Sequence, residues 1–135
     1  MHAKLSDVKA HILIVDDNED TRNAIRLTLE LESQVNYSFK EANTVSKGLK
    51  FFKSFKPNVI ILDLHLPGEN GFAFLEKLRK IRPSANDAVI VLTADDSFKN
   101  LWRAESSGVD AYHFMGKPFE GSELRAQVLG LALLN

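Results

Sequence analysis

The stretch NVIILDLHLPG, residues 58–68, decides the fold of this chain. Residues 59–62 form a continuous apolar run, which is typical of a short strand buried on both faces of a parallel sheet. The run ends at Asp63, and a loop rich in Pro and Gly follows. Ligands of open α/β sheets bind beyond the carboxyl ends of the strands, so a carboxylate there points into a crevice. Taken alone, this stretch leaves Asp63 as a metal ligand, a nucleophile or a strand-end cap.

Apolar runs and amphipathic stretches alternate along the rest of the chain. Asn18 or Asp20 is expected to cap the first helix and Ser122 the last, because short polar side chains satisfy the free N–H groups of a first turn. Trp102 is expected to pack beneath the fourth helix rather than to serve as an exposed anchor for a partner.

The spacing of apolar residues predicts the elements, since apolar runs predict strands and i, i+3, i+4 spacing predicts helices. The predicted strands are 11–15, 37–42, 59–63, 88–93 and 111–116, and the predicted helices are 19–31, 44–55, 72–81, 97–107 and 120–134.

This alternation of strands and helices predicts the architecture. Strict βα repetition favours a parallel sheet with helices on both faces, and right-handed crossovers leave few topologies. The strands at 11–15 and 59–63 are the most apolar and therefore central, whereas 37–42 alternates and is an edge. We therefore predict a flavodoxin-like (βα)5 doubly wound sheet with strand order 2-1-3-4-5, whose switch point lies between the first and third strands.

The composition is that of an ordinary globular domain. The chain has 135 residues, of which 44% are hydrophobic and 26% charged, and a net charge of -1. The lack of cysteine excludes disulfides and thiol chemistry, and the charge does not favour direct binding of nucleic acid. Neither a membrane span nor a signal peptide is evident, so we expect a cytoplasmic location without membrane contact. Residues 1–10 are predicted to be an N-terminal extension and 11–135 the domain.

Four strand ends bring related chemistry to one edge of the predicted sheet. Asp16 and Asp17 follow the first strand, Asp63 the third, Thr93 ends the fourth and Lys117 follows the fifth. Carboxylates this close repel one another unless a cation offsets their charge, and both Mg²⁺ and the lysine ammonium are suitable. A carboxylate, a metal ion, a hydroxyl and an ammonium together suit phosphoryl transfer, in which the carboxylate attacks phosphorus and the other groups bind the oxygens.

These motifs resemble the receiver domain of two-component response regulators. The resemblance rests on VDDN at 15–18, LDLHLPG at 62–68, LTA at 92–94 and KPF at 117–119. It implies that Asp63 accepts a phosphoryl group from a sensor histidine kinase or a phosphotransfer protein.

The resemblance also implies a metal site. Asp17, Asp63 and the backbone carbonyl of His65 would bind Mg²⁺, with Asp16 close by. The imidazole of His65 is expected at the mouth of the site. Lys117 would bind the phosphoryl group, and its bond to the following proline would be cis.

A conformational switch is the third implication of the resemblance. Thr93, the switch hydroxyl, would move towards the phosphoryl group, and an aromatic residue of the fifth strand would fill the vacated space. Residues 108–117 are longer than is usual, so the aromatic is Tyr112 or Phe114, depending on the end from which the strand is counted; we favour Phe114. The face of the fourth helix, fifth strand and fifth helix would then act on an output domain, a protein target or a second copy in a phosphorylation-dependent homodimer.

Two other functions account for parts of the pattern. A magnesium-dependent phosphohydrolase with an aspartyl-phosphate intermediate, of the haloacid dehalogenase type, would place a second Asp where this chain has His65. An interaction module that has lost phosphorylation would not need the acidic set together with Thr93 and Lys117. We therefore predict a signalling switch that catalyses only its own phosphorylation and dephosphorylation.

Overall fold

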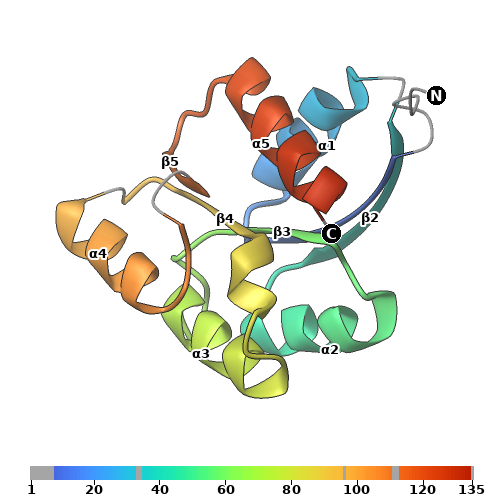
Figure 1. The fold of residues 1–135 in the computed structure, drawn as a ribbon. Helices are drawn as coiled ribbons and strands as arrows, with labels where there is room; N and C mark the ends of the chain where they lie inside the picture. Colours follow the sequence, from blue (N-terminus) through green and yellow to red (C-terminus); the bar gives the residue numbers. More distant parts are fainter. Residues whose placement is uncertain (1–7, 33–34, 96, 111–112, 135) are drawn as a thin grey trace.

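The domain is built on one parallel sheet, as the sequence predicts. The computed structural model describes residues 8–32, 35–95, 97–110 and 113–134 (Figure 1). Its five-stranded sheet has the order β2-β1-β3-β4-β5, which confirms both the predicted fold class and the predicted strand order. The strands are β1 (Lys9–Val15), β2 (Asn36–Ala42), β3 (Val59–Leu62), β4 (Val89–Thr93) and β5 (Phe114–Gly116).

Helices cover both faces of this sheet. Those of the described residues are α1 (Glu19–Glu30), α2 (Val45–Phe55), α3 (Gly71–Ile81), α4 (Phe98–Ser106), α5 (Gly121–Leu134) and a short 3₁₀ helix, η2 (Ala85–Ala88). Figure 1 shows α1 and α5 on one face and α2 and α3 on the other, with α4 on the side of α3. Within the described residues, no helix combines the length and apolar character that crossing a bilayer requires.

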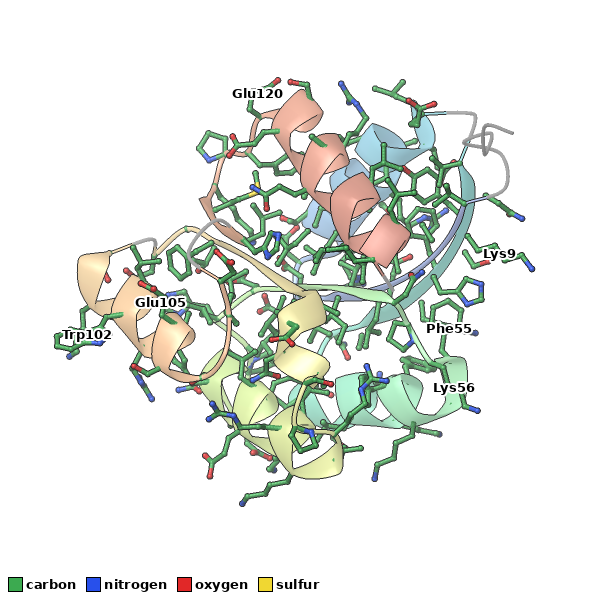
Figure 2. The ribbon with its side chains drawn as sticks, viewed as in Figure 1. Lys9, Phe55, Lys56, Trp102, Glu105 and Glu120 are labelled. Atoms are coloured by element: carbon green, nitrogen blue, oxygen red, sulfur yellow. The ribbon has the colours of Figure 1, made fainter. Side chains whose placement is uncertain are left out.

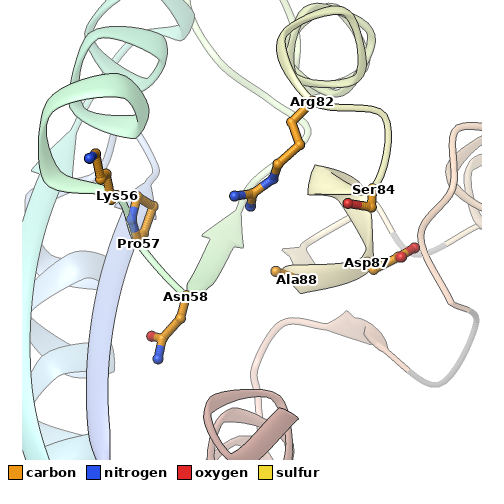
Figure 3. Close-up of a pocket in the computed structure, with 7 residues that line it drawn as sticks. All are labelled: Lys56, Pro57, Asn58, Arg82, Ser84, Asp87 and Ala88. Atoms are coloured by element: carbon orange, nitrogen blue, oxygen red, sulfur yellow. The ribbon is translucent and has the colours of Figure 1, made fainter. Parts of the chain in front are cut away.

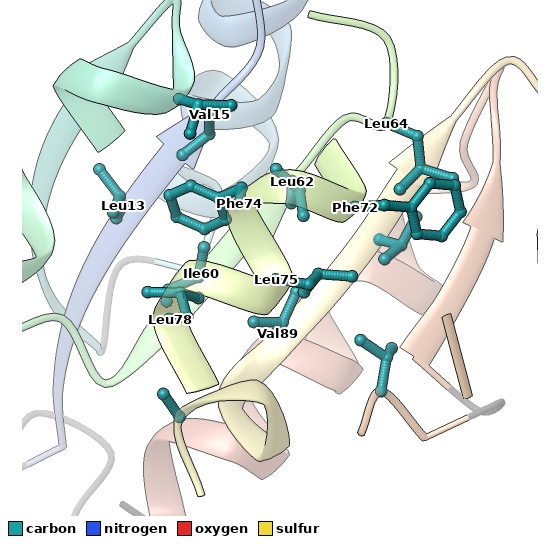
Figure 4. Packing of buried hydrophobic residues seen from close by; sticks show 14 of the residues in the cluster. Leu13, Val15, Ile60, Leu62, Leu64, Phe72, Phe74, Leu75, Leu78 and Val89 are labelled. Carbon is teal, nitrogen blue, oxygen red and sulfur yellow. The ribbon is translucent and has the colours of Figure 1, made fainter. Parts of the chain in front are cut away.

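The strands divide their side chains between two hydrophobic cores. In β1, Leu13 and Val15 face the α2–α3 side, whereas Ile12 and Ile14 face the α1–α5 side, because successive side chains of a strand point to opposite faces. Phe74 is fully buried and lies among side chains of β1 and β3 (Figure 4). Its ring also approaches α2 so closely that a Cβ at Gly48 would lie 2.7 Å from its Cε1.

Some predicted boundaries and caps differ from the structure. Asn18 caps α1 as predicted, accepting a 2.9 Å hydrogen bond from the Thr21 amide. Ser122 was expected to cap α5, and this is wrong: the carboxylate of Glu120 accepts the Ser122 and Glu123 amide N–H groups at 3.3 and 3.0 Å. The longer side chain of Glu120 reaches forward to the amides of the first turn, where negative charge is favoured. Hydrogen bonds from the Ser122 hydroxyl and these amides lower the pKa of Glu120.

The observed strand ends also differ from the predicted ones, and the largest differences are in the first and fifth strands. β1 begins at Lys9, two residues before the predicted start, and residues 111–112 of the predicted fifth strand lie outside the described residues.

Phe74→Ala is expected to lower the free energy of unfolding by about 3–5 kcal/mol, because it removes a buried ring that joins α2, α3 and the sheet. Urea denaturation followed by circular dichroism measures this. The matched control, Glu76→Ala, lies on the same helix with an exposed side chain, and its effect should stay within about 0.5 kcal/mol. Equal losses in the two variants would contradict this account of the core.

Candidate functional site

The acidic residues lie where β1 and β3 leave the sheet. Val15 and Leu62 are paired in register, so the residues that follow them, Asp16 and Asp63, emerge side by side. The Asp63 amide donates to the Val15 carbonyl at 2.9 Å. One carboxylate oxygen from each of Asp16, Asp17 and Asp63 can be chosen so that all lie within 4.8 Å of one another. The structure thus brings together the three carboxylates that the sequence predicted.

Lys117 offsets the charge of the two buried carboxylates. Asp16 is 2% exposed and Asp63 7% exposed, and buried charges are stable only when they are paired. The Nζ of Lys117 donates to Oδ2 of Asp16 at 2.7 Å and to Oδ2 of Asp63 at 2.9 Å. Asp17 is exposed to solvent. Three carboxylates therefore face one ammonium, and the site favours a further cation.

The pKa shifts follow from this arrangement. Burial raises the pKa of Asp16, although the Lys117 and Asn18 hydrogen bonds oppose the shift. Burial alone would lower the pKa of Lys117, but its hydrogen bonds to Asp16 and Asp63 and their negative charges raise it above its ordinary value. Lys117 is therefore a stable ammonium. Of Asp16 and Lys117, Asp16 is the residue whose charged form is disfavoured by its surroundings.

Each buried carboxylate divides its oxygens between the lysine and its own loop. Oδ1 of Asp16 accepts the Asn18 amide at 2.9 Å, and Oδ1 of Asp63 accepts the His65 amide at 3.1 Å. These local bonds orient the side chains towards the centre of the crevice. An oxygen-only donor set of this kind fits a hard divalent cation such as Mg²⁺.

The helix after β3 packs tightly against the acidic loop. A Cβ at Gly71 would lie 2.7 Å from Cα of Leu64 and 2.8 Å from the carbonyl oxygen of Asp63. The Gly71 amide donates to the Leu64 carbonyl at 2.9 Å. Only glycine allows this approach, so α3 begins directly behind Asp63. The role of Gly71 was missed, although its place after the Pro/Gly loop was a signal.

β4 and β5 bring Thr93 and Lys117 to the same edge. The Lys117 amide donates to the Thr93 carbonyl at 2.9 Å, and the bond between Lys117 and Pro118 is cis, as predicted. Thr93 is fully buried, and its Oγ1 accepts the Asp95 amide at 3.3 Å. The predicted roles of the site residues stay predictions, including the metal bond of the His65 carbonyl.

His65 lies at the mouth of the site, as expected. Its side chain is 66% exposed, and its Nε2 is 3.6 Å from Oδ2 of Asp95, whose side chain is 47% exposed. The two loops that follow β3 and β4 therefore meet at this pair.

Of the two predicted switch aromatics, the structure describes one. Phe114 is half-buried and packs against the core on the α2–α3 side, to which Phe72 and Ala104 also belong. The Arg103 guanidinium lies 3.9 Å above the centre of the Phe72 ring, so α4 also contacts α3 near the site. Tyr112 lies outside the described residues.

Trp102 does not pack beneath α4, and that prediction is wrong. Its side chain is 68% exposed and points away from the helix into solvent (Figure 2). The helix turns its small residue, Ala104, towards the core instead.

Another depression lies at the opposite, amino-terminal edge of the sheet (Figure 3). It has a volume of about 360 Å³, and none of the predicted site residues belongs to it. Its lining residues come from the segments before β3 and β4: Lys56, Pro57, Asn58, Arg82, Ser84, Asp87 and Ala88.

One contact of the acidic loop was not anticipated. Nη1 of Arg22 donates to the backbone carbonyl of Asp16 at 2.7 Å, and Nε of Arg22 donates to Oε1 of Glu41 at 2.9 Å. The two partners come from different elements, and the sequence carries no local signal for this contact.

The chain belongs to the response regulator receiver domain family, whose family model matches residues 12–129. The DNA-binding dual master transcriptional regulator RpaA of Synechocystis sp. is 32% identical over 120 residues, 89% of this chain and 48% of RpaA. The KDP operon transcriptional regulatory protein KdpE of Escherichia coli is 35% identical over 118 residues, 87% of this chain and 49% of KdpE. The chain thus spans about half the length of the curated relatives it matches.

Solved structures with this fold agree with the assignment. The receiver domain of the Francisella response regulator 1452 has a TM-score of 0.80 and 26% identity, covering 93% of this chain and 98% of that one. A CheY-like receiver domain protein from Methanospirillum hungatei has a TM-score of 0.79 and 28% identity, covering 93% and 94% of the two chains. The similarities favour a response regulator over a phosphohydrolase.

Lys117→Met is expected to destabilise the metal-free protein by about 3 kcal/mol near neutral pH, because it leaves two buried carboxylates facing each other. The variant also loses the Lys117 hydrogen bond that opposes the raised pKa of Asp16, so the loss should shrink as pH falls and Asp16 takes up a proton. Urea denaturation in EDTA at several pH values measures both effects.

The control, Lys53→Met, removes an equal charge from an exposed position on α2. Adding Asp16→Asn to Lys117→Met should restore part of the stability. A loss that does not change with pH, and that Asp16→Asn does not relieve, would mean that Lys117 does not offset these charges.

Proposed function

We propose that this chain is a phosphorylation-controlled switch in which Asp63 accepts a phosphoryl group from a histidine kinase or a phosphotransfer protein. The observation that carries the proposal is the position of the Asp63 carboxylate. It lies at the carboxyl edge of the sheet, 2.9 Å from the Lys117 ammonium and beside Asp16 and Asp17. A nucleophile, a fixed cation and ligands for a second cation are the groups that phosphoryl transfer requires.

In the proposed reaction, an oxygen of Asp63 forms a bond to phosphorus while the bond from phosphorus to the donor's leaving atom breaks. The leaving group takes the electron pair of that bond. Lys117 would exchange its hydrogen bond to Asp63 for one to a phosphoryl oxygen, and it stays charged because its pKa is raised. Asp16, Asp17, Asp63 and the His65 carbonyl would hold Mg²⁺, which supplies positive charge against the phosphoryl oxygens.

In this proposal, the residues next to the phosphoryl group carry the conformational change to the surface. The hydroxyl of Thr93 would turn towards it and give up its hydrogen bond from the Asp95 amide. Phe114 would then move, changing the face formed by α4, β5 and α5. The matched relatives include regulators named as DNA-binding or transcriptional. We therefore infer that this face acts on an output domain, a protein target or a second copy, and that it does so in the cytoplasm. In this proposal the domain itself contacts neither nucleic acid nor membrane. It catalyses only its own phosphorylation and dephosphorylation.

Incubation with acetyl phosphate and Mg²⁺ should add one phosphoryl group to the wild-type protein and none to Asp63→Asn, because the amide is no nucleophile. Intact-protein mass spectrometry measures the adduct. Asp87→Asn, an exposed carboxylate at the opposite edge of the sheet, is the control and should be labelled normally. The proposal is wrong if Asp63→Asn is labelled as fully as wild type, or if wild type stays unlabelled while a known receiver reacts.

Asp17→Asn is expected to weaken Mg²⁺ binding by roughly tenfold or more, since it removes the exposed ligand of the cluster. Without metal, the same change relieves repulsion, so the variant should be no less stable than wild type. Isothermal titration calorimetry and urea denaturation in EDTA give the two results. Asp20→Asn, in the first turn of α1 but outside the cluster, is the control; a similar Mg²⁺ affinity in both variants would remove Asp17 from the metal site.

A further inference from the structure

We infer that Arg22 is a positioning residue for the metal-binding loop, and that it acts by tying the backbone of Asp16 to the edge strand β2. This inference rests on the proposed function in that it concerns the same metal site. Arg22 touches none of the reacting groups. Its guanidinium instead contacts the loop from behind, on the side of β2.

Both backbone polar groups of Asp16 depend on the end of β2. The Asp16 amide donates to the Ala42 carbonyl at 3.0 Å. The Asp16 carbonyl accepts a 2.7 Å hydrogen bond from Nη1 of Arg22, whose Nε is held by Glu41 at 2.9 Å. Buried backbone groups must find partners, and here a strand-to-loop bond and a side-chain bridge supply them. The loop is thereby fixed on both sides of the Asp16 peptide.

A second arginine binds the other oxygen of Glu41. Oε2 of Glu41 accepts Nη1 of Arg26 at 2.9 Å, while its Oε1 binds Arg22. The Arg22 side chain is 15% exposed and that of Glu41 26% exposed. A charge-assisted bond at this depth is stronger than one on the open surface. Arg26 is 41% exposed and lies at the outer end of this network.

The geometry requires arginine rather than positive charge alone. One planar guanidinium donates to a carbonyl through Nη1 and to a carboxylate through Nε at the same time. A lysine ammonium is a point charge on a flexible stem and does not reproduce this fork. Glu41, which Arg22 and Arg26 share, and Glu30, 3.7 Å from Arg26, together balance the two arginine charges. The effect of Arg22 on the cluster is therefore mainly one of position.

The test compares Arg22→Met, Arg22→Lys and the matched control Arg26→Met, which lies on the same helix and shares Glu41 without contacting the loop. Mg²⁺ affinity is measured by isothermal titration calorimetry well below the melting temperature. We expect roughly tenfold weaker binding in Arg22→Met, as for other residues that orient metal ligands. Arg22→Lys should lie close to Arg22→Met, and Arg26→Met close to wild type.

A second readout needs no metal. In EDTA, amide hydrogen exchange measured by NMR should be faster at Asp16 and Asn18 in Arg22→Met than in Arg26→Met, because the loop has lost an anchor. Wild-type Mg²⁺ affinity and wild-type exchange in Arg22→Met would overturn the inference. Wild-type affinity in Arg22→Lys would also overturn it, since charge would then suffice. If the wild-type protein binds no Mg²⁺, the metal part of the proposed function fails, while the exchange data still judge the role of Arg22.

Discussion

The ammonium of Lys117 between Asp16 and Asp63 is the interaction on which the site depends. Lys117 lies 101 positions after Asp16 and 54 positions after Asp63 in the chain. The interaction therefore brings the end of β5 to the ends of β1 and β3. Two carboxylates this well buried would otherwise repel each other and draw in water or protons. The lysine balances one of the two buried negative charges and leaves the other, and the exposed Asp17 adds a second unbalanced charge.

Lys117 also links the acidic cluster to β4 and β5. Lys117 is bonded through its amide to the Thr93 carbonyl, so the lysine and the buried hydroxyl belong to adjacent strands of one ladder. β2 and β5 are both edge strands, but β5 pairs with β4 over three residues, whereas β2 pairs with β1 over seven. On the other side, Arg22 and Ala42 of β2 form hydrogen bonds with the backbone of Asp16. The site thus lies between a long strand pairing on its β2 side and a short one on its β5 side.

Much of the fold and site could be predicted because strand-end motifs are local. The apolar runs that lead into Asp16, Asp63 and Thr93 predict strands. They also place these residues at the carboxyl edge of the sheet, since all parallel strands end at one side. The predictions that are wrong concern how far a side chain reaches and which way it points. Glu120, not Ser122, caps α5, and Trp102 faces solvent. The contact of Arg22 with Asp16 could not be predicted, because it needs Glu41 from another element to hold the guanidinium.

The sequence by itself determined the alternation of strands and helices, the strand order and the residues that gather at the carboxyl edge. It did so because hydrophobic period and strand length are properties of short segments. Only the tertiary structure decided how charge is shared there: which carboxylates are buried, which oxygens Lys117 binds, and what holds the loop from behind. Those facts depend on distances between segments that are remote in the chain, and they are set by packing of the whole sheet.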